Sequence, residues 1–308
     1  MFDIRRLEPR EAHDVALRAA TQLRSDASKN RLVNAETSLE QLRDALASAA
    51  ASTWIALDEG RIVGHLYGAL LENSTHGRGV WVGPDGVSFD HAEVLDALYA
   101  TAAQQWIDEG ANEHFVWVLD DPASTVEWFN LGFALLHARG VMELDPRCRE
   151  LPRGYAIRLG TLDDLDLALQ LDDELDAFQR EGPSFSLGPA TPAQRDDWLE
   201  TLSDPDSRHF IVEHEHDVAA HCVTFPLPSL RGAFERTIHL SAVLVRAEHR
   251  GRGVAKAMID LALSDARSQG FRYGETNWRL SNRTADKFWR DYGFETTYVR
   301  LHRTIGEF

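Results

Sequence analysis

The sequence predicts a mixed α/β fold that occurs twice in tandem, and three observations support this. The 308 residues exceed the length that one hydrophobic core usually organises, so two domains are expected. Short patterns recur in the same order in both halves of the chain. Between the halves lies Asp145–Gly154, which has two prolines, a glycine and no apolar periodicity. We therefore expect a first domain over 1–145, a linker over 146–153 and a second domain over 154–308.

The recurring patterns indicate which elements each half contains. They are an opening strand, a hairpin and a closing W-x-x-x-G-F element, and the offset between the copies grows from 152 to 156 to 161 residues. They lie at 4–7 and 156–159, at 54–65 and 210–221, and at 128–133 and 289–294. Each half is expected to run strand, helical region, hairpin, strand, helix, strand, helix, strand. Such an order gives a mixed α+β sheet with helices packed on it.

Composition argues against several classes of protein. A formal net charge of −17 disfavours binding to the phosphate backbone of nucleic acids and suits cationic partners. No apolar run is long enough to span a bilayer, and the N-terminus lacks the apolar stretch of a signal peptide, so we expect a cytoplasmic protein without a membrane partner. The two cysteines, Cys148 and Cys222, have no metal-ligand spacing, so no metal site is expected.

A glycine-containing loop between a strand and a helix is the strongest functional signal. The β-branched, apolar segment Ile238–Val245 predicts a strand. A helix is predicted from Val254, because apolar residues recur on one face and Gly270 follows as a C-cap. The loop consists of Arg250, Gly251, Arg252, Gly253, Val254 and Ala255. Free N–H groups at a helix N-terminus, glycines and arginines suit a pyrophosphate. An ordinary glycine turn with two solvated arginines is the alternative.

At this loop the chain resembles the GCN5-related N-acetyltransferase (GNAT) superfamily. The acetyl-CoA signature of the superfamily, R/Q-x-x-G-x-G/A after the fourth strand, is matched by Arg250, Gly253 and Ala255. Its Asn-x-x-Ala helix ending in Gly-Phe is matched by Asn282–Phe294. The resemblance covers residues 154–308, and the whole chain resembles tandem members such as mycothiol synthase in architecture.

The resemblance implies two tandem GNAT-like acyl-CoA N-acyltransferase domains with acetyl-CoA as the acyl donor. Backbone amides of Val243, Leu244 and Val245 would bind the pantetheine arm and the acyl carbonyl, while the loop from Arg250 to Ala255 would hold the pyrophosphate. Asn282 would also contact the coenzyme. Its alternative role is to cap the last helix, and the two roles are compatible.

The chemistry of acyl transfer calls for a general base. An amine attacks a thioester only when it is deprotonated. The superfamily often places a base on the fourth strand, and its tandem members carry a carboxylate where this chain has His239. Strict alternation puts His239 on one face with Val243 and Val245. The histidine is either this base or a hydrogen-bonded core residue, and Glu275 on the next strand is the second candidate.

The acid that reprotonates the leaving thiolate is less clearly marked. The usual acid of the superfamily is a tyrosine four residues before the glycine of Gly-Phe, and here that position is Trp289. Tyr292 is the nearest tyrosine, with packing as its default role. Solvent is an alternative source of the proton.

The first domain is expected to be a degenerate copy. Its phosphate loop would lie near Gly83–Val87, but segment 80–93 has three acidic residues and neither Arg nor Lys. Asp121 stands where Asn282 stands in the second half. A pyrophosphate would therefore be repelled, and this domain would only support the active one.

These features predict an acetyl-CoA-dependent N-acetyltransferase whose second domain transfers an acyl group to a primary amine by direct attack. The acceptor, a small molecule or a peptide, is expected to be cationic because of the net charge and the acidic helix 163–176. Gly182–Pro189 is a substrate lid or a plain surface loop. The alternative functions are a non-catalytic acyl-CoA sensor and a binding module without a cofactor. A monomer and a homodimer both stay open.

Overall fold

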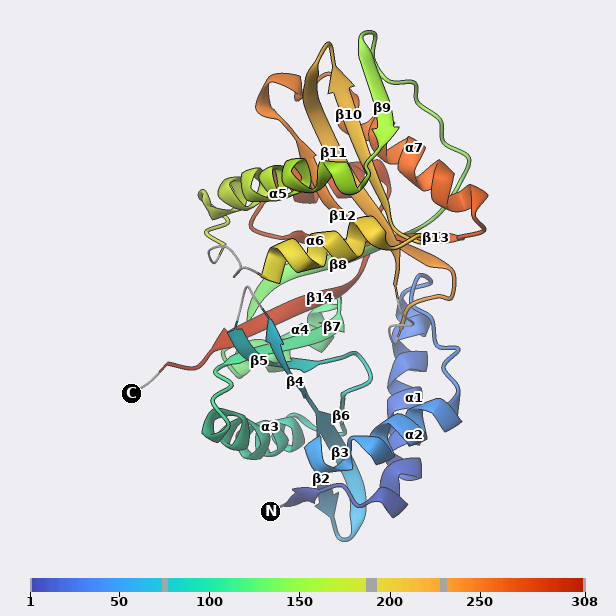
Figure 1. Ribbon diagram of the computed structural model, residues 1–308. Coiled ribbons are helices and arrows are strands. Elements are labelled where there is room, and N and C mark those ends of the chain that lie inside the picture. Colours follow the sequence, from blue (N-terminus) through green and yellow to red (C-terminus); the bar gives the residue numbers. More distant parts are fainter. Residues whose placement is uncertain (1, 74–76, 187–192, 228–231, 307–308) are drawn as a thin grey trace. The chain divides into compact units, whose positions relative to one another are not determined.

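The computed structural model describes residues 2–73, 77–186, 193–227 and 232–306, and the chain forms two compact units (Figure 1). The first unit comprises Met1–Ala138, Leu230–Phe234 and Thr296–Phe308, and the second comprises Arg139–Ser229 and Glu235–Glu295. These units differ from the ranges 1–145 and 154–308, because the closing strand of the chain pairs with a strand of the first unit. Leu187–Pro189, the end of the expected lid, lies outside the described residues.

The second unit contains strands in the order β8-β13-β12-β11-β10-β9. They are β9 (Tyr155–Leu159), β10 (Arg208–His214), β11 (Asp217–Pro226), β12 (Thr237–Val245), β13 (Tyr273–Arg279) and, from Arg139 on, β8 (Ala134–Glu143). From β9 to β12 neighbouring strands are antiparallel, whereas β12 and β13 are parallel. The mixed sheet expected from the sequence is thereby confirmed.

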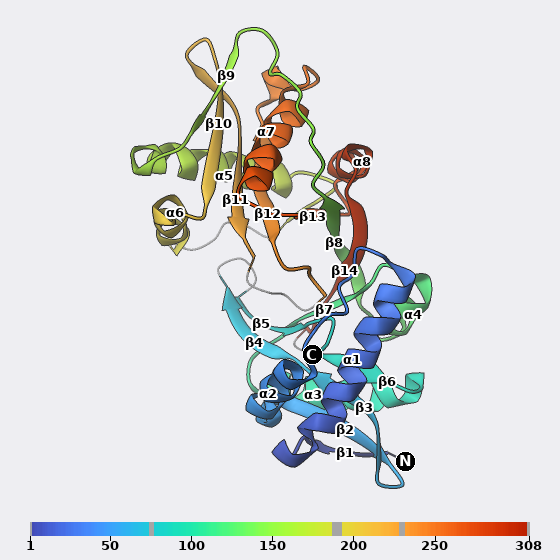
Figure 2. The same cartoon turned by 90° about the vertical axis from the view of Figure 1, so that its right-hand side faces the viewer.

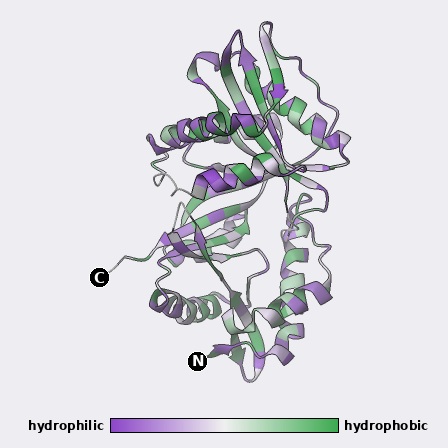
Figure 3. Cartoon of the chain, in the orientation of Figure 1, coloured by the Kyte–Doolittle hydropathy of each residue, from purple (hydrophilic) through white to green (hydrophobic). Residues whose placement is uncertain are grey.

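Helices cover both faces of this sheet. They are α5 (Leu165–Arg180), α6 (Ala193–Ser203), α7 (Val254–Ser268) and α8 (Arg283–Tyr292), with short 3-10 helices η3 (Leu162–Asp164) and η4 (Ala247–His249). Figure 2 shows α5 and α6 on one side of the strands and α7 and α8 on the other. Helix α7 begins at Val254, as its apolar periodicity predicts, and buries Ala257, Met258 and Ala262. In Figure 3, apolar and polar residues alternate along α5, whose Leu165, Ala168 and Leu171 are buried.

The first unit repeats the pattern with two sheets, ordered β1-β2-β3-β6 and β4-β5-β7-β14. The strands are β1 (Asp3–Arg6), β2 (Thr53–Asp58), β3 (Arg61–Tyr67), β4 (Ala69–Asn73), β5 (Gly77–Val82), β6 (Val87–Phe89), β7 (Glu113–Leu119) and β14 (Glu295–Thr304). The helices are α1 (Ala12–Lys29), α2 (Leu39–Ser48), α3 (Ala92–Asp108) and α4 (Pro122–Asn130), with η1 (Pro9–Glu11) and η2 (Ala50–Ser52). Strand β14 pairs antiparallel with β7, from Tyr298 opposite Leu119 to Thr304 opposite Glu113.

In the described parts of the two units, none of the helices is both long and apolar enough to cross a bilayer. Both cysteines are free thiols: Cys148 is exposed, and Cys222 is buried, which raises the pKa of its thiol. Among the described residues, no group of three or more His, Cys, Asp or Glu side chains is placed to hold a metal ion.

Buried histidines in both units make stability dependent on pH. Burial lowers the pKa of His65 and His209 to about 4 and that of His221 to about 3, whereas the unfolded value is about 6.5. Between pH 6.5 and 4 the unfolded chain therefore binds protons that the folded chain does not. We expect the free energy of unfolding to fall as pH falls through this window, by about 1.4 kcal/mol per pH unit for each proton taken up.

Urea unfolding at pH 7.5, 6.5 and 5.5, combined with NMR titration of the imidazoles, measures this effect. Rings of His65, His209 or His221 that become charged near pH 6.5 in the folded protein, or an unfolding midpoint that rises toward pH 5.5, would contradict it.

Candidate functional site

The parallel pairing of β12 with β13 stops partway along β12. The register comprises Thr237 opposite Tyr273, Ile238 opposite Gly274 and His239 opposite Glu275, and extends no further in the described residues. The carbonyl of Leu240 accepts a hydrogen bond from the Thr276 hydroxyl at 2.8 Å. Six residues of β12 follow His239 before the strand ends. One edge of this stretch is therefore left without a strand partner.

A bulge at Ala242 lies in this stretch. Ala242 has φ of 49°, a left-handed conformation that is strained for a residue with a Cβ. Opposite it, the register with β11 changes from Val223–Ser241 to His221–Leu244, so β12 contains one extra residue. The bulge reverses the alternation of side chains beyond it. The expectation that Val243 and Val245 share the face of His239 is therefore wrong, and Leu244 takes that face.

The loop after β12 leads into α7 with an open approach to the helix N-terminus. Gly251 and Gly253 have φ of 72° and 86°, and a Cβ added to either would meet no heavy atom within 4 Å. Gly253 is the N-cap residue and has no side chain with which to cap α7. The first N–H groups of the helix therefore face unfilled space, which suits an anion such as a pyrophosphate.

The arginine that opens the loop is held by neighbouring groups. Arg250 Nε donates to the carbonyl of Val245 at 2.9 Å, and its guanidinium carbon lies 4.8 Å from the ring centre of Phe178 on α5. Arg246 makes a bidentate ion pair with Glu174, at 2.9 and 2.6 Å, which ties α5 to the end of β12. Arg252 is exposed. The loop is thus anchored at its first residue and open at its middle.

His239 and Glu275, the two candidate bases, lie beside each other where the pairing ends. Their residues are 9% and 1% exposed, and His239 Nδ1 lies 3.9 Å from Glu275 Oε1. This nitrogen is buried and has no hydrogen-bond partner among the described residues. Burial lowers the pKa of His239, while the charge of Glu275 opposes that shift and the charge of Arg139 adds to it. At neutral pH the imidazole is therefore neutral and able to accept a proton.

Glu275 also receives a second partner that was not expected from the sequence. Arg139 Nη2 donates to Glu275 Oε2 at 2.6 Å, and both side chains are buried. Arg139 comes from β8, which in sequence belongs to the first half of the chain. The sequence does carry a signal for this residue, since an arginine follows the Gly-Phe of each half by six residues, at Arg139 and Arg300.

In the first unit β6 corresponds to the end of β12, because Ser88 lies opposite His65 as Leu244 lies opposite His221, and among the described residues β6 is also an edge strand. The pairing of β5 with β7 continues to Val82 opposite Val116, and Val82 is the last residue of β5. Beyond it Gly83–Gly86 forms a turn, β6 pairs with β3, and α3 begins at Ala92 after only two intervening residues. The segment Gly83–Val87 is therefore not a loop before a helix, because a strand separates it from α3. This corrects the expected position of the first phosphate loop.

Comparison with known proteins gives a family match for part of the chain. A family model described as the acetyltransferase (GNAT) family matches residues 172–294. The second half of the chain carries a GNAT acetyltransferase domain. A search of the curated proteins gives no match. The matched range includes β12, the glycine loop, β13 and α8, so the segments described above are those of the family domain.

Solved structures share the fold along nearly the whole chain. A GCN5-related N-acetyltransferase from Sphaerobacter thermophilus has a TM-score of 0.68 at 16% identity, with 99% of this chain and 96% of that one covered. A tandem GNAT protein from the clavulanic acid biosynthesis pathway has 0.57 at 15%, covering 100% of both chains. A GCN5-related N-acetyltransferase from Kribbella flavida has 0.51 at 13%, covering 83% and 88%. The chain thus has a tandem GNAT fold.

Asn282 and Trp289 both have structural roles in this GNAT domain. Asn282 caps α8, because its side chain accepts a hydrogen bond from the N–H of Ala285 at 3.0 Å. Trp289, which stands at the position of the usual tyrosine acid, packs against Phe288 and Phe294. Asp121, the counterpart of Asn282, makes no such cap and pairs with Lys29 at 3.1 Å.

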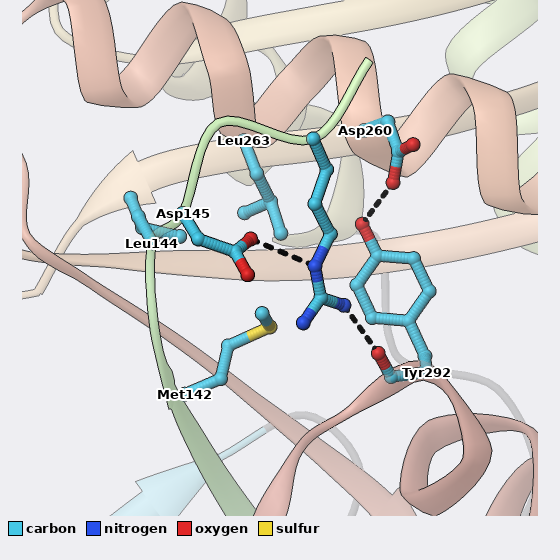
Figure 4. A pocket seen from close by; sticks show the side chains of 7 residues that line it. Met142, Leu144, Asp145, Asp260, Leu263 and Tyr292 are labelled. Carbon is cyan, nitrogen blue, oxygen red and sulfur yellow. Dashed lines mark hydrogen bonds and ion pairs between the residues drawn. The ribbon is translucent and has the colours of Figure 1, made fainter. Parts of the chain in front are cut away.

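Tyr292 takes part in a network with the segment that follows β8 (Figure 4). Its hydroxyl donates to the buried Asp260 of α7 at 2.7 Å, and Asp260 also accepts from Arg149 at 2.8 Å. The main-chain carbonyl of Tyr292 accepts a hydrogen bond from Arg147. Burial, and then the bond to Asp260, raise the pKa of Tyr292, which makes it a weaker proton donor. The network ties α7, α8 and residues 147–149 together and agrees with the packing role.

The glycine loop yields a prediction with a matched control. Gly253 and Gly270 lie at opposite ends of α7, both have positive φ, and both have open space where a Cβ would go. Leucine at either position costs roughly 1–2 kcal/mol of backbone strain. Only Gly253→Leu places a side chain in the expected path of the pyrophosphate. Isothermal titration should show acetyl-CoA affinity reduced by at least about tenfold in Gly253→Leu and unchanged in Gly270→Leu, with both proteins folded. Equal affinities in the two variants would remove the loop from the site.

Proposed function

We propose that the second unit is an acetyl-CoA-dependent N-acetyltransferase acting in the cytoplasm on a primary amine. The observation that carries this proposal is the end of the β12–β13 pairing at His239 and Glu275, six residues before β12 ends. Six extended residues span roughly 20 Å. This stretch connects a buried base candidate to an open helix N-terminus. The unpaired edge of β12, including Val243–Val245, would bind the pantetheine arm while the loop holds the pyrophosphate.

The residues at the end of the pairing suit direct attack. The ammonium group of the acceptor first gives one proton to the neutral imidazole of His239, directly or through water. The freed lone pair then forms a bond to the thioester carbonyl carbon, the C–S bond breaks, and the second proton of the nitrogen leaves to solvent. The leaving thiolate takes its proton from solvent. Tyr292 is given no part in this step, because its hydroxyl is engaged with Asp260.

The acceptor is proposed to be a cationic amine of a small molecule or peptide. The net charge of −17 favours its approach. The acidic residues of α5 divide between two roles. Asp172 accepts from Trp198 at 3.1 Å and Glu174 pairs with Arg246, so these two carboxylates hold the fold together. Asp173 is exposed, and burial raises the pKa of Asp176.

The first unit is proposed to be a degenerate copy without a coenzyme site, because only two residues separate β6 from α3 and they include neither a glycine nor an arginine. Asp90, one of the two residues before α3, forms an ion pair with Arg18 at 2.6 Å. This acidic position would repel a pyrophosphate.

A non-catalytic acyl-CoA sensor is the second candidate function. Two observations favour it: a packed Trp289 at the position of the usual acid, and the engaged hydroxyl of Tyr292. A sensor and an enzyme share the coenzyme site and differ in whether His239 accepts a proton from an amine.

Substitution of His239 separates the two functions. His239→Gln should lower turnover by about a hundredfold or more, the usual contribution of a general base, and should leave acetyl-CoA affinity within about twofold. His209→Gln is the control, because His209 is also a buried histidine of the same unit. The measurement is release of the CoA thiol across a panel of primary amines, as a function of pH. Because the pKa of His239 is lowered, the acid limb should lie below pH 6.5.

Near-normal turnover in His239→Gln would make the histidine a core residue and Glu275 the base to test. Tight acetyl-CoA binding by the unmodified protein without thiol release for any amine would favour the sensor.

A further inference from the structure

We propose that Arg139 is a positioning residue of the acyl-transfer site, so that the first half of the sequence supplies part of the catalytic arrangement. This inference rests on the proposed function of His239 and Glu275. It goes beyond that function because it assigns a role to a buried cation that belongs neither to the glycine loop nor to the candidate bases.

The two oxygens of Glu275 face different partners. Oε2 accepts from Arg139 Nη2 at 2.6 Å, and Oε1 lies 3.9 Å from His239 Nδ1. The tautomer of His239 with its hydrogen on Nδ1 directs that hydrogen toward Glu275 and leaves Nε2 as the proton acceptor. After the proton is accepted, the imidazolium has a carboxylate within ion-pair distance. Arg139 fixes the carboxylate from its other side.

Stability alone gives no reason to keep such a pair. Arg139 and Glu275 have side chains only 5% and 1% exposed, and taking two charges out of water offsets most of their attraction. Apolar residues of similar volume are often as stable in such positions. A carboxylate that must stay ionised beside a catalytic imidazole does need a buried cation, because burial without one would protonate it.

The second copy of the fold shows the same arginine in a different setting. Arg300 follows Phe294 by six residues, as Arg139 follows Phe133. In the first unit its guanidinium lies 4.8 Å from the ring centre of Trp81 and donates to His137 Nδ1 at 2.6 Å. An arginine at this position therefore packs on an aromatic ring in one unit and pairs with a buried glutamate in the other. The partner of the arginine therefore differs between the two units.

The charged groups that act on His239 are few. Glu275 faces it from β13 and Arg139 from β8, while the neighbour from β11 is the ring of Phe225, at 5.0 Å. Against the same region α5 presents the apolar Leu165 and Leu169. Asp260, the buried acid of α7, accepts hydrogen bonds from Tyr292 and Arg149 instead. Removing Arg139 thus removes the one cation among the described residues that acts on the His239–Glu275 pair.

The pH dependence of the pair provides the test. Because the charge of Arg139 lowers the pKa of His239, its loss should let the imidazole take up a proton at higher pH. Arg139→Gln should move the acid limb of the kcat/KM profile upward by about one pH unit or more and leave the KM for acetyl-CoA unchanged. Arg139→Lys, which keeps the charge, should restore most of the original limb. Arg300→Gln, the matched change in the first unit, should leave the limb where it is.

NMR titration of the His239 imidazole in the wild type, Arg139→Gln and Arg139→Lys measures the same shift without turnover. If Arg139→Gln does not fold, Arg139→Met, which also removes the charge, carries the same test. An unmoved limb and an unmoved titration in a folded variant without the charge would overturn the inference. A shifted titration in a protein that transfers no acetyl group would overturn the proposed function and leave only the electrostatic effect of Arg139 on His239.

Discussion

The site depends on β12 losing its parallel neighbour after His239. If the pairing continued to Val245, both edges of β12 would be filled and no chain could lie along it. The bulge at Ala242 accompanies this change and holds a left-handed residue at a cost of roughly 1–3 kcal/mol. Such strain persists only where the surrounding strands fix it, here through the register with β11 on either side. The strained strand therefore lies where the ligand is expected.

Much of the second unit could be predicted because its signals are local. The helix from Val254, its buried face and the glycine loop all follow from residue spacing within about twenty positions. The element order of both halves follows from the recurring strand, hairpin and Gly-Phe patterns. The capping role of Asn282 could be predicted because this residue directly precedes an amphipathic segment.

The features that the sequence did not predict depend on long-range pairing. Arg139 meets Glu275 because β8 lies beside β13, and only the equal spacing of Arg139 and Arg300 from their Gly-Phe elements could have indicated a shared role. The predicted face of Val243 and Val245 was wrong because a β-bulge reverses the alternation of side chains. Ala242 is not a residue type, such as glycine, that usually indicates a bulge. The prediction of a phosphate loop at Gly83–Val87 was wrong because β6, which begins at Val87, has only three residues and gives too short a pattern to be recognised as a strand.

Hydrogen–deuterium exchange of the intact chain, with and without acetyl-CoA, tests most directly the claim that one unit alone binds the coenzyme. Slower exchange is expected at residues 241–255, which include the unpaired edge of β12 and the N-terminus of α7, and no change is expected at residues 80–93 of the first unit. Protection of both segments to a similar degree, or of neither, would contradict the account.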